Sequence, residues 1–296
     1  MTIKAMKPLP KNKTAEVYYR TALNNEIQKF IDKMLKEIEK NYTTVKVANS
    51  SYENFNNPKN PTITTFERLI KFFKDIWQIS FLTNSEKIIN KFVRMAKKQT
   101  IKAIKERFLD INISVIPNTK EYEEILKLVV KRNVGLIKNV SSQTINNIEN
   151  IVSNAMINNQ PYTEIYKGLK HQKEIAKNRV KLIADDQIHK FNQALNRLNQ
   201  QTGGIEYFEW FGIDDGRERK EHIKLNGKIF KWGDIPERLP IIQEDKNGIV
   251  RGYPGEAVRC RCQGLAYYVD LDEYDPIWLG DNKGYKFIKK RKRQNE

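Results

Sequence analysis

Apolar residues recur at helical spacing through most of the first two-thirds of the chain. From Thr14, a candidate N-cap, one stripe predicts a first helix. Residues 41–64 break the spacing with Asn, Pro and Ser, and are predicted as a long mobile connection. Helical spacing resumes over 66–77 and again, after a start signal at 83–86, over 88–108. The first stripe consists of Leu23, Ile27, Phe30, Ile31, Met34, Leu35 and Ile38.

A short interruption at 111–117 precedes the remaining helices. Four more helical segments are predicted, near 120–138, 142–158, 162–170 and 172–201. Thr202-Gly203-Gly204 ends the last of them, because glycine is favoured just beyond a helix end. We interpret all these apolar stripes as core faces and assign a ligand to none of them.

The pattern changes from helical to alternating after Gly204. Residues 205–211 are aromatic and alternate in polarity, so they predict a strand. Asn226-Gly227 is a tight-turn signal that precedes a second strand-like run at 228–232, and 264–269 predict a third. Residues 233–259 contain several Pro and Gly residues and are predicted mostly as loop.

These elements predict an α+β protein. Its helix-rich N-terminal region contains several helices, which form either a separate bundle or an elongated arm, and a small mixed α/β module follows it. The predicted divisions are an N-terminal helix and flexible linker at 1–60, a helical domain at 61–204, the C-terminal module at 205–270 and a basic tail at 271–296.

Composition adds a polyanion partner to this picture. Hydrophobic residues make up 39% of the chain, enough for a packed core, and 53 Lys and Arg against 36 Asp and Glu give a formal charge of +17. Such an excess attracts nucleic acid through counterion release, although a lysine-rich chain can be basic without a dedicated site. The candidate contacts, in a tail predicted as disordered, are Lys289, Lys290, Arg291, Lys292 and Arg293.

The chain is expected to be a soluble protein made in a reducing cytoplasm. Its two cysteines lie one residue apart and cannot join distant segments. The N-terminus has no apolar signal core, and no apolar run approaches the roughly 20 residues needed to cross a bilayer.

The candidate chemistry lies in the C-terminal module. Thiolate and imidazole are ligands that zinc selects, so Cys260, Cys262 and His222 are candidate zinc ligands, with Asp215 as the fourth. The alternative is a pair of buried thiols beside an Asp–Arg network, and spacing alone favours that alternative.

The order of elements in this module resembles the Mu F-like head morphogenesis family, the minor capsid proteins of tailed phages. The resemblance covers roughly 175–268, and Arg259 and Asp186-Gln187 depart from it, since the family usually has Asn and Thr-Glu there. Late in the preceding helix stands Ile183-Ala184-Asp185-Asp186-Gln187. The motif residues that then follow in order are Trp210, Asp215, Arg217, Arg219, His222, Asn226-Gly227, Pro254, Gly255, Cys260, Arg261 and Cys262.

The resemblance implies a non-enzymatic virion component. It implies binding to the portal protein, assembly with the major capsid or scaffolding protein, and contact with packaged double-stranded DNA during packaging or ejection. The expected location is the head interior or the portal vertex, after synthesis in the host bacterial cytoplasm.

Two other classes of function stay open. One is a metal-dependent nuclease or hydrolase centred on His222, although the chain has only three histidines and no recognisable nucleophile or phosphate-binding motif. The other is a generic basic DNA-binding protein, which lacks the interleaved aromatic residues typical of single-strand binding.

Overall fold

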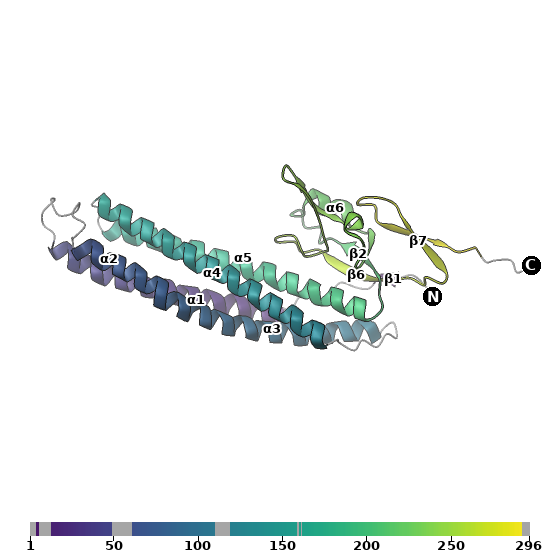
Figure 1. Ribbon diagram of the computed structural model, residues 1–296, viewed down its shortest axis with the longest axis horizontal. Helices are drawn as coiled ribbons and strands as arrows, with labels where there is room; N and C mark the ends of the chain where they lie inside the picture. Colours follow the sequence, from purple (N-terminus) through teal and green to yellow (C-terminus); the bar gives the residue numbers. More distant parts are fainter. Residues whose placement is uncertain are drawn as a thin grey trace, which may run out of the picture. The chain divides into compact units, whose positions relative to one another are not determined.

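The computed structural model describes residues 4–5, 13–48, 61–109, 119–158, 160 and 162–291. Helices dominate the chain up to residue 202, and short strands follow, which confirms the predicted α+β class (Figure 1). The N-terminal elements are β1 (Lys4–Ala5), α1 (Lys13–Ala48), α2 (Pro61–Phe72), the π-helical turn η2 (Phe73–Trp77), α3 (Gln78–Leu109), α4 (Thr119–Ile157) and α5 (Tyr162–Thr202). The C-terminal elements are β2 (Tyr207–Phe211), α6 (Lys220–Leu225), β3 (Ile229–Lys231), the 3₁₀ turn η3 (Pro236–Arg238), β4 (Ile241–Asp245), β5 (Gly248–Arg251), β6 (Gln263–Tyr268), β7 (Tyr274–Trp278) and β8 (Tyr285–Lys289).

The chain forms two compact units. The helical unit consists of Thr14–Val93 and Leu128–Asp185, and the mixed unit consists of Met1–Lys13, Arg94–Lys127 and Asp186–Glu296. None of the described helices is both long enough and apolar enough to span a membrane.

The helical unit is an antiparallel four-helix bundle. Contacts between neighbouring helices pair rising residue numbers on one helix with falling numbers on the next, as in an up-down-up-down arrangement. The pairs are Tyr19 with Phe92 and Phe30 with Phe81 (α1 and α3), Lys74 with Glu149 and Gln78 with Ser141 (η2–α3 and α4), Asn139 with Arg179 and Asn147 with Gln172 (α4 and α5), and Arg20 with Asp185 and Asp32 with Lys173 (α1 and α5).

One polar pair lies in the core of this bundle. The hydroxyl of Tyr19 donates to Asn133 Oδ1 over 2.5 Å, and Asn133 Nδ2 donates to the backbone carbonyl of Val129 over 2.8 Å. Burial raises the pKa of Tyr19 far above its ordinary value, so the hydroxyl keeps its proton. The buried side chain of Asn133 is thus hydrogen-bonded through both its oxygen and its nitrogen.

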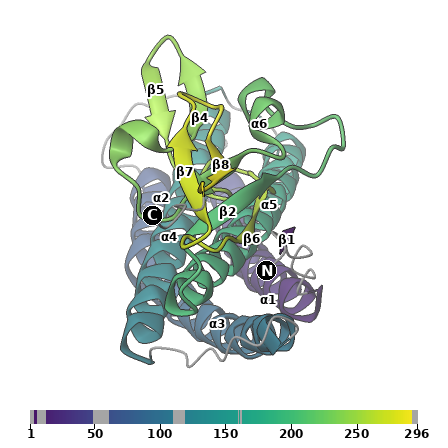
Figure 2. The same cartoon turned by 90° about the vertical axis from the view of Figure 1, so that its right-hand side faces the viewer.

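The mixed unit is built on an antiparallel sheet with strand order β1-β6-β2-β3. In the register of this sheet, Phe208 on β2 lies between Ala266 on β6 and Phe230 on β3. Figure 2 shows the sheet beside the C-terminal part of α5. The buried residues of this core are Phe208, Trp210, Leu225, Phe230, Trp232, Ile242, Tyr253, Ala257, Cys260 and Cys262.

Helix α5 is joined to the sheet by side-chain amides that bond to the backbone of Gly264. The Nδ2 of Asn196 and the Nε2 of Gln200 both donate to the Gly264 carbonyl, at 2.7 and 2.8 Å. Gln200 also accepts the indole N–H of Trp232 at 2.8 Å. The buried amide groups of α5 therefore find their hydrogen-bond partners at Gly264 and Trp232.

Several predicted helix boundaries are wrong. The segments predicted at 120–138 and 142–158 are one helix, α4, and those at 162–170 and 172–201 are one helix, α5. Ser141 lies at the first predicted break, where its hydroxyl donates to the Lys138 carbonyl and leaves the helix intact. The connection predicted from residue 41 begins later, because α1 runs to Ala48 and α2 starts at Pro61; residues 49–60 lie outside the described part of the chain.

Two hairpins replace predicted irregular structure. Strands β4 and β5 pair within the stretch predicted mostly as loop, and β7 and β8 pair within the predicted basic tail. Lys289 ends β8, and Lys290 Nζ donates to the Leu271 carbonyl at 2.9 Å, so both are held by the hairpin. Lys292 and Arg293 lie outside the described residues. The domain divisions at 60, 204 and 270 stay predictions.

Candidate functional site

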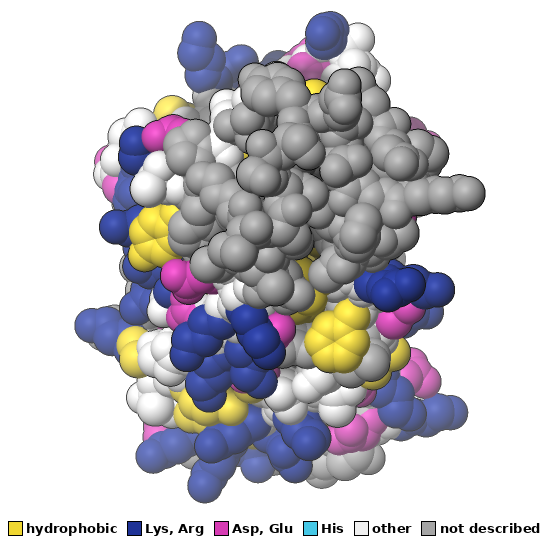
Figure 3. Space-filling model, turned by 90° about the vertical axis from the view of Figure 1, so that its left-hand side faces the viewer, with side chains coloured by type: hydrophobic (Ala, Val, Ile, Leu, Met, Phe, Trp, Pro, Cys, Tyr) yellow, Lys and Arg dark blue, Asp and Glu magenta, His cyan; other side chains and the backbone are white. Residues whose placement is uncertain are grey.

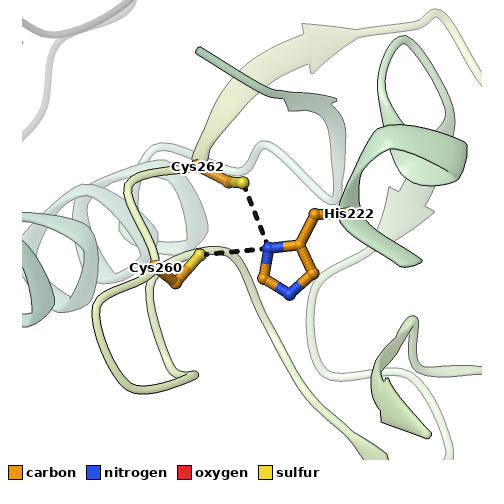
Figure 4. A group of neighbouring side chains, drawn as sticks. All are labelled: His222, Cys260 and Cys262. Carbon is orange, nitrogen blue, oxygen red and sulfur yellow. Dashed lines mark hydrogen bonds between the residues drawn. The ribbon is translucent and has the colours of Figure 1, made fainter. Parts of the chain in front are cut away.

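The side chains of His222, Cys260 and Cys262 meet inside the mixed unit, although 38 and 40 positions separate the histidine from the two cysteines. His222 stands on the short helix α6, and the cysteines belong to the loop that leads into β6 (Figure 4). All three side chains are buried, with 2%, 4% and 2% exposure in that order.

Both sulfurs face one nitrogen of the imidazole. The distances from His222 Nδ1 are 3.5 Å to Cys260 Sγ and 3.4 Å to Cys262 Sγ, and the three atoms lie within 4.8 Å of one another. On the other side of the ring, Nε2 lies 3.0 Å from the carbonyl oxygen of Ile242. A carbonyl can only accept, so Nε2 carries a proton and donates it, and in the neutral ring Nδ1 presents its lone pair to the sulfurs.

The surroundings favour negative charge on Cys260. The hydrogen bond with the Cys262 thiol lowers the pKa of Cys260, and the contacts with His222 and with the Cys262 backbone act in the same direction. The backbone N–H of Gly255 donates to the same sulfur at 3.4 Å. For Cys262, the bond with Cys260 and burial raise the pKa, against the opposite effect of the Trp210 indole N–H. Of the two sulfurs, Cys260 is therefore the one on which the local hydrogen bonds favour negative charge.

The histidine is influenced by the same pair. Burial on its own would lower the pKa of His222, but the hydrogen bond with Cys260 and the charge of that group raise it above its ordinary value. The ring of Trp210 packs edge-on against the imidazole, with 5.3 Å between ring centroids. Trp210 therefore covers one side of the cluster.

Asp215, the fourth candidate ligand, is engaged in a separate network of charged groups. Both terminal guanidinium nitrogens of Arg261 donate to its carboxylate, one of them to Oδ1 at 2.6 Å. Arg217 donates to the same carboxylate at 2.6 Å. The hydrogen bonds from Arg261 and Arg217 hold the pKa of Asp215 far below its usual range. A different carboxylate, that of Glu218, accepts a hydrogen bond from Cys262 Sγ, with Oε1 at 3.7 Å.

The remaining motif residues hold the loop that carries the cysteines. Arg219 donates to the Val258 carbonyl at 2.8 Å. Gly255 has a φ of +87°, and a Cβ at that position would lie 2.6 Å from Gln193 Cγ, so the site requires glycine. At the other turn, Asn226 Oδ1 accepts the Gly212 N–H at 2.9 Å and Gly227 has a φ of +72°. Pro254 is buried next to Gly255.

Sequence reasoning missed the amide residues of α5. Gln193, Asn196 and Gln200 recur at spacings of three and four, which places them on one face of the helix, and all three are buried. Their spacing was the available signal, because a row of amide side chains on the buried face of a helix must find hydrogen-bond partners in the core. Glu218 was also missed, because a single acid between two arginines carries no distinctive pattern.

This arrangement defines a class of protein: an antiparallel helical bundle and an α+β module whose motif residues form a buried His–Cys cluster and a separate Asp–Arg network. The model of the family described as Phage Mu protein F like protein matches residues 146–265. Residues 146–265 are therefore similar to the Mu F-like family of phage head proteins, which confirms the resemblance that the motif order predicts.

One relative extends the likeness over more of the chain. An uncharacterized protein of Haemophilus influenzae is 23% identical over 260 residues, which cover 86% of this chain and 54% of that protein. The chain thus spans about half the length of the curated relative that it matches. No solved structure matches the chain significantly.

Proposed function

We propose that this protein is a minor head protein that binds the portal, assists head assembly and contacts DNA during packaging or ejection. Its place would be the head interior or the portal vertex, beside major capsid or scaffolding protein. The observation that carries the proposal is the family match over 146–265, which contains every motif residue from Ile183 to Cys262. Charge supports the DNA contact, because +17 on one chain favours the neutralisation of closely packed phosphates.

The distribution of basic residues agrees with this role. Figure 3 shows one face, on which Lys and Arg side chains stand among hydrophobic and acidic ones rather than in one dense stripe. Such dispersed charge suits sequence-independent contact with DNA, since phosphates attract it regardless of base sequence.

We place the protein-binding surface on the hairpin of β4 and β5. Ile249 and Val250 are 55% and 49% exposed there, and the pattern along β5 leaves three successive residues open to solvent. Ile249 and Val250 are adjacent, so they form a small continuous apolar surface that a partner protein can cover. We therefore expect this hairpin to contact the portal.

The test is capture of the portal protein encoded by the same phage genome. The full chain, co-expressed with that portal protein, is expected to purify with it, and a double variant, Ile249→Ser with Val250→Ser, is expected to lose most of the captured portal. The matched control is Ile157→Ser, which changes an apolar residue that is 74% exposed in the helical unit. Absence of the chain from assembled heads would contradict the proposal as a whole, whereas retained capture by the double variant would contradict only the choice of surface.

A further inference from the structure

We propose that His222, Cys260 and Cys262 bind a zinc ion that fastens the cysteine loop to α6. The three side chains suit zinc, because two thiolates and one imidazole are ligands that zinc selects. This inference stands apart from the proposed function, since it concerns the stability and metal content of the module.

The spacing of the three donor atoms fits a single ion. With Zn–S of about 2.3 Å and Zn–N of about 2.0 Å, tetrahedral angles place sulfur and nitrogen about 3.5 Å apart and the two sulfurs about 3.8 Å apart. The observed separations of 3.4 and 3.5 Å between Nδ1 and the two sulfurs agree with these edges. The two sulfurs lie within 4.8 Å of each other, which is compatible with the expected sulfur–sulfur distance.

The histidine presents the correct nitrogen. A metal-bound imidazole ordinarily donates its other N–H to a carbonyl or carboxylate, which fixes the ring. Nε2 of His222 has this relationship with the Ile242 carbonyl at 3.0 Å, and Nδ1 is left to face both sulfurs. Without a metal, one lone pair would face two thiols, and only one of them could donate to it.

The backbone around Cys260 also suits a thiolate. The N–H of Gly255 points at Sγ from 3.4 Å, and this bond is stronger to a charged sulfur than to a thiol. The indole N–H of Trp210, which packs beside the same cluster, is buried without a hydrogen-bond partner in the described structure. Each thiol would release its proton to solvent when it binds the ion, and the fourth position would be taken by a water molecule or by Glu218.

Elemental analysis of the purified full chain is the first experiment. The protein is expressed in zinc-supplemented medium, purified in a non-thiol reductant and dialysed against metal-free buffer. The expected result is about one zinc per chain, the load of a single site. No stoichiometric zinc, together with thiols that react fully with a thiol reagent in the folded protein, would overturn the proposal. An intact mass lower by two hydrogens would overturn it in favour of a Cys260–Cys262 disulfide.

Cobalt substitution identifies the ligands. The chain has only two cysteines, so a thiolate-to-cobalt charge-transfer band in the zinc-free protein must come from Cys260 and Cys262. Wild type is expected to show this band with tetrahedral d–d bands. His222→Asn is expected to bind cobalt at least tenfold more weakly and to lose the tetrahedral signature, while the control His171→Asn keeps both.

A variant that fails to fold would not leave the question open, because the wild-type spectrum decides it. Cobalt that binds wild type without a charge-transfer band would overturn thiolate ligation. A second measurement on wild type is thermal unfolding with and without a chelator. The zinc proposal expects the chelator to lower the Tm, and an unchanged Tm after complete zinc removal would contradict the fastening role.

Discussion

The carboxylate of Asp186 on α5 accepts a hydrogen bond from the backbone N–H of Arg259, at 2.5 Å. These two residues stand where the sequence departs from the pattern of the family, and the structure brings them together. Asp186 also pairs with Lys190 at 2.8 Å, with 11% exposure of both side chains. The bond to Arg259 joins α5 to the loop that carries Cys260.

Replacement of Asp186 by Ala is expected to destabilise the protein by about 1–3 kcal/mol, because the Arg259 N–H and the Lys190 ammonium both lose an acceptor in a largely enclosed site. Urea unfolding followed by circular dichroism measures the change. Asp186→Asn is the matched control. It keeps the Oδ1 acceptor, so it should lose distinctly less free energy of unfolding than Asp186→Ala. Equal losses in the two variants would show that the bond to Arg259 is unimportant.

Replacement of Arg259 by Asn is expected to stabilise the protein by up to about 1 kcal/mol. Arg259 has a φ of +58°, in the left-handed region that side chains other than Gly, Asn and Asp adopt at a cost. Asn is also the residue that the family usually has there. Arg259→Ala serves as the control, since it removes the same side chain and keeps the unfavourable backbone. The Tm of the Asn and Ala variants should differ, and identical values would contradict the backbone explanation.

Replacement of Asp215 by Asn is expected to lower the stability of the protein at neutral pH and to lower it less in acid. The Arg261 and Arg217 guanidinium groups depress the pKa of Asp215, so its charge contributes stability that is complete above the ordinary carboxyl pKa of about 4. That contribution is lost as pH falls through and below this value toward the depressed pKa. Tm measured from neutral pH into acid should therefore show a gap between wild type and variant that narrows as the pH falls. A constant gap would sink the charge explanation.

Replacement of Gly264 by Ala is expected to cost about 1–3 kcal/mol, because its Cβ would lie 2.7 Å from the Trp232 ring and would crowd a closely packed core. Gly135→Ala offers a control of opposite sign. That glycine lies in α4 with no atom within 4 Å of the added Cβ, so Ala should stabilise the helix by about 0.5–1 kcal/mol. Chemical denaturation of both variants against wild type measures the pair.

Binding to double-stranded DNA is expected to weaken with salt, and the tail should contribute to that dependence. Truncation after Lys290 removes Arg291, Lys292 and Arg293 while it keeps the β7–β8 hairpin and the Lys290 hydrogen bond. The slope of log affinity against log salt should fall by about 0.9 for each phosphate that the truncated chain no longer neutralises. Filter binding over a range of salt concentrations measures it. An unchanged slope would assign DNA binding to the helices instead of the tail.

The sequence predicted those parts of the fold whose signals are local. The stripe from Leu23 to Ile38 repeats at helical spacing, and it forms the buried face of α1. The alternating run at 205–211 contains β2, because its aromatic residues face a core. The order of the motif residues predicted the family for the same reason, since a motif can be read without knowledge of tertiary structure.

The remainder depended on tertiary interactions that leave no local pattern. Strand β7 contains Pro276, and proline argues against a central strand because it has no backbone N–H. In the two-stranded sheet of β7 and β8, β7 is an edge strand, so the proline is tolerated. The predicted break in α4 falls at 139–141, but there the Ser141 hydroxyl donates to the Lys138 carbonyl and accepts from Gln78, so the helix continues. The pairing of Asp215 with Arg261 instead of the sulfurs depends on the direction in which the loop presents each side chain.

The alternation along residues 260–262 makes the length of this loop a constraint. Both cysteines turn toward His222, while Arg261 between them turns toward Asp215. Insertion or deletion of a single residue here would exchange the two directions, so the guanidinium would enter the donor cluster and the thiols would leave it. Natural variation in chain length should therefore accumulate at the tips of the hairpins and be absent between these two cysteines.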